Sequence, residues 1–138
     1  MLKVLIPVLG DKAATEAARH GALLFAERCA AEVEIVEVLD DLAQGRAVAF
    51  HSLGTLRRQG KQAARNALMQ TRAILEDAGV PYTWSRVYGP TAQTIAQYAA
   101  KHRADIVLLD GSRLGFIRRW AVAIGLWRLS STPVTMLH

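Results

Sequence analysis

The residues best suited to chemistry lie in a polar loop near the end of the chain, directly after an uninterrupted apolar run. The run spans Ile106 to Leu109, and the loop that follows it contains Asp110, Gly111, Ser112, Arg113 and Gly115. Glycines let backbone amides approach an anion, while a serine hydroxyl and an arginine add a donor and a positive charge. This loop, together with Gly125 further along the chain, is therefore a candidate site for a phosphate group.

The same residues also have a purely structural interpretation. Gly111 and Gly115 can simply permit tight turns, and Gly125 can allow close packing within a helix. Asp105 and Asp110 are most simply the residues at the two ends of a strand. The negative charge of Asp110 beside the loop also disfavours a phosphate ligand. Both interpretations of the loop stay open at the level of sequence.

The elements that position this loop alternate between strand and helix along the whole chain. Apolar runs rich in β-branched residues predict strands over residues 2–8, 32–39, 82–88, 106–109 and 134–137. Apolar residues at helical spacing predict helices over residues 12–30, 55–78, 91–102 and 117–129. This order predicts a single α/β domain, residues 1–138, with an open parallel sheet and helices on both faces. Ligands of such sheets bind beyond the carboxyl ends of the strands, where the candidate loop lies.

Local signals set the ends of these elements. Asp11 and Thr91 are predicted N-caps, since their side-chain oxygens can accept hydrogen bonds from the free amides of a first helical turn. The acidic residues within 32–39 predict that one face of this strand is less covered than the faces of the first strand. Residues 40–54 show no clear period and are interpreted as a mobile loop.

The composition predicts a soluble globular protein, with 51% apolar and 21% charged residues. The longest apolar run, Trp120 to Trp127, falls well short of the about 20 residues that span a bilayer, so no membrane partner is expected. The first residues do not match a signal peptide. Cys29 is the sole cysteine, which excludes an internal disulfide framework and fits a reducing cytoplasm.

The net charge of +5 raises the question of an anionic partner. Basic residues cluster at Arg57, Arg58, Lys61 and Arg65, and again at Arg113, Arg118, Arg119 and Arg128. One interpretation is a solvated helix face plus a basic loop, and the other is an adaptor module that binds an anionic partner. Nucleic acid is not expected, because no aromatic residues alternate with the first cluster as stacking platforms. The four histidines have no ligand-like spacing, so no metal site is expected, and no catalytic motif stands out.

The last predicted helix carries a large apolar surface, formed by Trp120, Ile124 and Trp127. This surface either covers the sheet or forms a protein interface, since aromatic residues beside arginines are frequent interface anchors. Trp127 is therefore a candidate contact between two subunits.

Several segments together resemble the universal stress protein family over almost the whole chain. They are Lys3–Val8, the alanine-rich first helix, Tyr88–Ala99, Ala104–Leu109 with Gly111–Arg113, and the closing Pro133–Val134. The resemblance implies the family's five-stranded sheet in the order 3-2-1-4-5, a fold also described as adenine nucleotide alpha hydrolase-like. It further implies a homodimer through pairing of the last strands, here Val134, Thr135, Met136 and Leu137.

Some members of this family bind ATP and others do not. The binders resemble one another in an acidic residue that ends the first strand, and in a loop of Gly, two residues, Gly, nine residues, Gly, then Ser or Thr. This chain has Leu9 in place of the acid and Leu126 in place of the hydroxyl residue, and it has three residues between Gly111 and Gly115. The spacing from Gly115 to Gly125 does match the family. The resemblance implies that ATP or AMP, if bound, contacts Gly111, Ser112, Arg113 and Gly115, with Pro7 and Val38 near the base.

These features lead to three functional hypotheses. The first is a non-enzymatic cytoplasmic stress-response dimer with weak or degraded nucleotide binding, acting through an unidentified protein partner. The second is an ATP- or AMP-binding switch with slow hydrolysis, which the glycine spacing favours and Leu9 with Leu126 disfavours. The third is the basic adaptor module, whose binding should weaken steeply with added salt.

Overall fold

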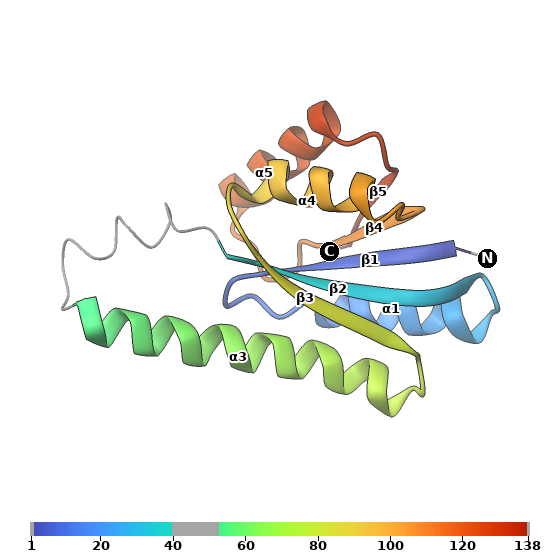
Figure 1. Ribbon diagram of the computed structural model, residues 1–138, viewed down its shortest axis with the longest axis horizontal. Coiled ribbons are helices and arrows are strands. Elements are labelled where there is room, and N and C mark those ends of the chain that lie inside the picture. The colour runs from blue at the N-terminus through green and yellow to red at the C-terminus, as the bar shows by residue number, and fades with distance from the viewer. Residues whose placement is uncertain (1, 40–52, 138) are drawn as a thin grey trace.

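The computed structural model describes residues 2–39 and 53–137, in which strands and helices alternate (Figure 1). The strands are β1 (Leu2–Leu9), β2 (Ala30–Leu39), β3 (Tyr82–Tyr88), β4 (Ile106–Asp110) and β5 (Val134–Leu137). The helices are α1 (Thr15–Ala26), α3 (Leu53–Asp77), α4 (Thr91–Lys101) and α5 (Phe116–Leu129). Each strand and helix predicted from the sequence is therefore present, with shifts at several ends.

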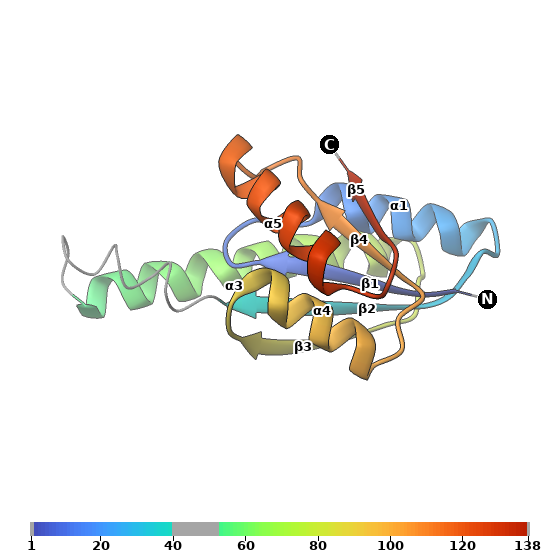
Figure 2. The same ribbon diagram turned by 90° about the horizontal axis from the view of Figure 1, so that it is seen from above.

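The five strands form one parallel sheet in the order β3-β2-β1-β4-β5, which confirms the predicted fold class and strand order. β1 lies at the centre, and its apolar residues from 4 to 9 are buried. A central strand covered on both faces needs such a continuous apolar run. α1 and α3 cover one face of the sheet, and α4 and α5 cover the other (Figures 1 and 2).

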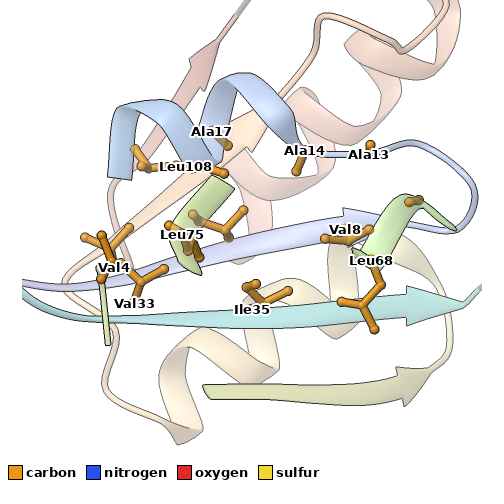
Figure 3. Packing of buried hydrophobic residues seen from close by; sticks show 14 of the residues in the cluster. Val4, Val8, Ala13, Ala14, Ala17, Val33, Ile35, Leu68, Leu75 and Leu108 are labelled. Carbon is orange, nitrogen blue, oxygen red and sulfur yellow. The ribbon is translucent and has the colours of Figure 1, made fainter. Parts of the chain in front are cut away.

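On the first face, strand residues pack against α3 and against the small residues of α1 (Figure 3). Val4, Val8 and Ile35 join Leu68 and Leu75 of α3 in one apolar cluster. α1 contributes Ala14, Ala17 and Ala18 to this cluster. A Cβ atom at Gly21 would lie 3.3 Å from Cδ1 of Ile6, so small residues let α1 lie close on the sheet.

On the second face, α4 and α5 cover a separate apolar cluster. It comprises Leu5, Leu9, Val36, Val38, Val107 and Leu109 from the strands, Ile95 and Ala99 from α4, Val122 and Leu126 from α5, and further neighbours. α4 and α5 approach each other closely at Gly125, where a Cβ atom would lie 2.6 Å from Cβ of Ala92.

Both predicted N-caps are wrong. α1 begins at Thr15 with Ala14 as its N-cap residue, because the chain after β1 first makes a turn in which the Lys12 amide donates to the Leu9 carbonyl (3.0 Å). Asp11 lies in that turn, too early to cap the helix. Thr91 is the first residue of α4, and Pro90 occupies its N-cap position.

The prediction that β2 has a less covered face is also wrong. Glu34 and Glu37 are 7% and 0% exposed. They are buried because each has a basic partner, Lys3 for Glu34 (3.3 Å) and Arg86 for Glu37 (3.1 Å). The predicted mobile loop, residues 40–54, falls almost entirely outside the described residues. Within the described ranges, no helix combines the length and the apolar character needed to cross a bilayer.

Candidate functional site

The candidate loop lies where the sheet changes its winding direction. β1 and β4 are neighbours, but β1 leads into α1 on one face while β4 leads into α5 on the other. The carboxyl ends of two such strands diverge and form the usual ligand crevice of an open α/β sheet. Leu9 and Gly10 end one strand, and Asp110 and Gly111 end the other.

Asp110 organises this end of the sheet. Its Oδ2 atom accepts hydrogen bonds from the amides of Glu16 (2.8 Å) and Ala17 (3.1 Å) in the first turn of α1. Its Oδ1 atom accepts from the Ser112 amide (2.9 Å) and from the Ser112 hydroxyl. The Asp110 side chain is buried at the positive end of α1, where a bound anion would otherwise be stabilised.

Donors predicted to meet a phosphate are therefore already engaged. Ser112 gives both its amide and its hydroxyl to Asp110. The Gly111 amide donates to the Leu137 carbonyl in β5 (2.7 Å). A Cβ atom at Gly111 would lie 3.0 Å from that same carbonyl oxygen and 3.3 Å from Nε of Arg119. The close approach of β5 and Arg119 thus accounts for the glycine at this position.

Gly125 and Leu126 lie away from the loop. Both are inside α5, which begins at Phe116 and continues to Leu129. Gly125 faces Ala92 of α4, and Leu126 is 1% exposed in the apolar cluster of the second face. The glycine at position 125 thus lets α4 and α5 pack closely, which agrees with the interpretation that Gly125 has a packing role.

The apolar residues predicted near a ligand are buried. Leu9 and Val38 are buried in the same cluster as Leu126. Pro7 is buried within β1, beside Val36 of β2 in the sheet register. The structure brings Leu9, Val38 and Leu126 together, but in the core, and none of their side chains has a polar atom to offer a ligand.

What remains suited to an anion is the start of α5. Gly115 is its N-cap residue, with an extended backbone, and Arg113 is exposed two residues earlier. A helix N-terminus carries a partial positive charge, and the arginine adds a full one. Nε of Arg119 is buried nearby and has no hydrogen-bond partner in the described part of the chain. This corner can attract an anion, with fewer donors than the loop predicted from sequence.

A buried polar cluster at the amino end of the strands was missed by sequence reasoning. Glu34 accepts a hydrogen bond from the Tyr98 hydroxyl and pairs with Lys3 (3.3 Å) and with Nδ1 of His102 (3.4 Å). The Tyr98 and His102 rings stack with their centroids 3.9 Å apart. Burial, reinforced by the hydrogen bond to Glu34, raises the pKa of Tyr98 to about 12. The available signal was an acidic residue inside an apolar strand, which indicates a buried partner as readily as an open face.

A second buried acid, Glu37, lies on the opposite face of β2. Its Oε2 atom accepts from Nε of Arg86 (3.1 Å), and this hydrogen bond raises the pKa of the Arg86 guanidinium. Within the described residues, its Oε1 atom has no hydrogen-bond partner. The pair links β2 to β3 and contributes no side chain to the crevice between β1 and β4.

The residues predicted at a subunit contact lie on two different elements. Val134, Thr135, Met136 and Leu137 form β5, a half-buried strand at the edge of the sheet beside β4. Trp127 is 83% exposed on α5. In the first basic cluster, Lys61 and Arg65 are exposed on α3, whereas the side chains of Arg57 and Arg58 fall outside the described residues.

A shallow hollow beside α1 is lined by Glu16, Arg19, His20, Leu23 and Leu137. It lies on the α1 side of the strand ends and includes no residue of the glycine loop. Over residues 2–39 and 53–137, no group of three or more His, Cys, Asp or Glu residues could hold a metal ion.

The chain matches the model of the universal stress protein family over residues 1–138. The universal stress protein UspA from Lactobacillus plantarum has a similar structure, with a TM-score of 0.69 and 20% identity over 99% of this chain and 97% of that one. A universal stress protein from Archaeoglobus fulgidus in complex with dAMP has a TM-score of 0.68 and 16% identity over 100% and 98% of the two chains.

A family protein from Arabidopsis thaliana with AMP bound has a TM-score of 0.67 and 16% identity over 99% of this chain and 91% of that one. These similarities in structure show the shared fold. A search of curated proteins finds no significant match. The match of the family model to the whole chain, together with the observed strand order, shows that this chain belongs to the universal stress protein family.

Proposed function

We propose that this chain is a non-enzymatic stress-response protein of the cytoplasm whose nucleotide site is degraded, so that adenine nucleotides bind only weakly. Structures of this fold have been obtained with dAMP and with AMP, which makes an adenine nucleotide the ligand class to consider. One observation carries the proposal: the Asp110 carboxylate accepts hydrogen bonds from the backbone amides of Glu16, Ala17 and Ser112. A phosphate at this end of β4 would need the same donors.

The negative charge of Asp110 also opposes the binding of a phosphate. A carboxylate about 5 Å from a phosphate, at an effective dielectric constant of about 20, opposes binding by roughly 3 kcal/mol per unit charge. That energy corresponds to a loss of affinity of about a hundredfold. Leu9 and Leu126 are buried in the core and offer no hydrogen bond that would offset the loss.

Calorimetric titration with AMP and with magnesium ATP tests this proposal. The wild-type chain should show no saturable heat at submillimolar nucleotide. Asp110→Asn removes the negative charge and weakens the hydrogen bonds from Ser112. The affinity of this variant for nucleotide should therefore be at least about tenfold higher than that of the wild type. Asp105→Asn is the matched control, because Asp105 lies at the other end of β4 and accepts from the Lys3 amide (2.7 Å).

Submillimolar binding by the wild-type chain would overturn the degraded-site proposal. If Asp110→Asn binds no better than Asp105→Asn, then Asp110 is not the barrier. The competing function, a switch with slow hydrolysis, predicts phosphate release from ATP that rises with protein concentration. We expect no release above that of a heat-denatured sample.

We propose further that the protein is a homodimer through β5. The support is its position, since in the described chain this strand pairs only with β4 and leaves its other edge available. An available strand edge is a template for pairing with a second chain. Sedimentation velocity should show a dimer for the wild type and a monomer for Thr135→Lys, because a lysine at a strand edge opposes such pairing. A monomeric wild type would refute this part of the proposal.

A further inference from the structure

The outward face of α5 exposes an unusual number of large apolar side chains. They are Phe116 (73% exposed), Ile117 (83%), Trp120 (54%), Ile124 (47%) and Trp127 (83%). At about 100° per residue, these positions fall within an arc of about 100° around the helix, and they extend over about 16 Å of its length. A different side of the same helix, with Val122 and Leu126, already packs in the core. The side chains of the outward arc therefore do not contribute to the hydrophobic core.

The side chains of this arc are exposed and are not part of the apolar cluster that α5 shares with the sheet. α5 lies at the outer side of the layer that covers the second face of the sheet (Figures 1 and 2). Phe116 and Trp120 contact each other edge to face, with centroids 6.2 Å apart, and both stay largely exposed. Contiguous exposed apolar patches of this kind mark sites of contact with a protein or a membrane.

The charge around the arc favours an anionic occupant. From Gly111 to His138 the sequence contains no Asp or Glu, yet it contains Arg113, Arg118, Arg119 and Arg128. The α4 segment, from Tyr88 to Ala104, also lacks acidic residues. Arg113 and Arg128 are exposed, and Arg118 is half-buried. The whole helical layer on this side of the sheet is thus basic.

This charge distribution argues against a second copy of the chain as the occupant. Two such faces in contact would bring arginines together without any carboxylate from either α5. Like charges placed opposite each other across an interface weaken association. The occupant must therefore supply both an apolar interior and negative charge.

An anionic phospholipid surface supplies both. Tryptophan rings prefer the interface between headgroups and acyl chains, and an arginine can bury its aliphatic stem while its guanidinium stays among the phosphates. A helix with bulky apolar residues on one face and arginines beside them can lie in the plane of a membrane without spanning it. The expectation of no membrane partner came from the absence of a long apolar run, which excludes a span but not this arrangement.

We propose that α5 docks this chain onto the surface of an anionic phospholipid bilayer, with Phe116, Ile117, Trp120, Ile124 and Trp127 inserted at the level of the headgroups. The proposal does not depend on nucleotide binding or on pairing through β5. It assigns a role to the outward arc that neither the core nor the candidate nucleotide site uses.

Vesicle co-sedimentation tests the proposal. Vesicles of phosphatidylcholine alone are compared with an equimolar mixture of phosphatidylcholine and phosphatidylglycerol. The wild-type chain should bind the mixed vesicles, should bind those of phosphatidylcholine alone far more weakly, and should be released by salt because surface charge is screened. The variant Trp120→Ser/Trp127→Ser should lose at least about tenfold in binding, given the apolar area removed.

Two further variants serve as a control for the loss of apolar area and as a test of the role of charge. Met69→Ser removes an apolar side chain that is 58% exposed on α3, on the other side of the sheet, and should bind like the wild type. Arg113→Gln/Arg128→Gln should weaken binding to the mixed vesicles only. Circular dichroism of each variant verifies the fold.

Equal binding by the wild type and the double tryptophan variant, or no binding to the mixed vesicles, would overturn the proposal. If the wild type ignores vesicles and sediments as a dimer that the tryptophan substitutions dissociate, the occupant is a second copy and the proposal is wrong. If a protein with an acidic surface binds α5 while vesicles do not, the proposal is equally wrong.

Discussion

The carboxylate of Asp110, at the end of β4, lies 2.8 Å from the backbone amide of Glu16 in the first turn of α1. The two residues are 94 positions apart in the sequence. A helix N-terminus is usually capped by a side chain from its own first residues, whereas here the cap comes from another strand of the sheet. Asp110 therefore ties the β1–α1 unit to β4 at the point where the sheet changes its winding direction.

Replacing Asp110 should reduce stability markedly. Asp110→Ala leaves the amides of Glu16, Ala17 and Ser112 without their acceptor, and we expect a loss of about 2–4 kcal/mol in the free energy of unfolding. Asp110→Asn keeps one acceptor oxygen and should lose about half as much. Urea unfolding measures both values. The control is Asp105→Ala, at the exposed end of β4, which should cost about 1 kcal/mol or less. Equal costs at the two positions would contradict the capping role.

Gly125 should resist substitution for a reason of packing. An alanine in the middle of a helix normally gains about 1 kcal/mol over glycine. Here its Cβ atom would lie 2.6 Å from Cβ of Ala92, so α4 and α5 must separate. We expect Gly125→Ala to lose about 1–2 kcal/mol net, since overpacking costs about 1–3 kcal/mol.

The double variant Ala92→Gly/Gly125→Ala distinguishes packing from any role of Gly125 in binding. Removing the Ala92 methyl group makes room for the new one, so stability should recover by more than the two single effects predict. Urea unfolding of the four proteins gives this coupling energy. A coupling near zero would show that contact with Ala92 is not the reason for the glycine.

The fold was predictable because its signals are local. Continuous apolar runs marked the strands, and helical spacing of residues such as Ile95 and Ala99 marked the helices. The order of the elements then limited the topology, since parallel strands need right-handed crossovers. The errors fell at helix starts. Asp11 looked like the cap of α1, but the observed cap comes from the distant Asp110, and Thr91 looked like the cap of α4, but Pro90 occupies that position.

The candidate site was harder to predict because its residues are used by contacts between distant segments. The contact of Ser112 with Asp110 is local, two residues apart, but nothing near Asp110 in sequence indicates that its other oxygen accepts from the amides of Glu16 and Ala17 in α1. Gly125 matched a family spacing by position, but its neighbour Ala92 is visible only in the fold. Likewise, Glu34 and Glu37 looked exposed because their basic partners come from other strands.

The ion pair of Glu37 and Arg86 should respond asymmetrically to substitution. Glu37 is fully buried, whereas Arg86 is exposed on β3, so each side chain left alone meets a different environment. Arg86→Ala leaves the buried Glu37 carboxylate without its partner and should lower the free energy of unfolding by about 3–5 kcal/mol. Glu37→Met leaves an arginine that water can reach, and it should cost less than about 1 kcal/mol. Thermal and urea unfolding measure both, and equal costs would argue that Glu37 is hydrated in solution.

Tyr98 should make the stability of the protein depend on pH in the alkaline range. Burial and the hydrogen bond to Glu34 raise its pKa from 10.0 to about 12, so the folded protein retains a proton that the unfolded chain releases. The stabilisation is complete below pH 10 and is lost as the pH rises towards about 12. A shift of this size corresponds to about 2–3 kcal/mol.

Comparison with Tyr98→Phe isolates this contribution from other groups that titrate at high pH. The variant cannot ionise at this position, and it also lacks the hydroxyl that contacts Glu34 and Ser85. At about pH 9 the wild type should be more stable than the variant by about 1–3 kcal/mol. That gap should narrow by roughly 2 kcal/mol by about pH 12, as measured by urea unfolding at fixed ionic strength. A gap that stays constant across this range would mean that the folded protein releases the Tyr98 proton as easily as the unfolded chain does.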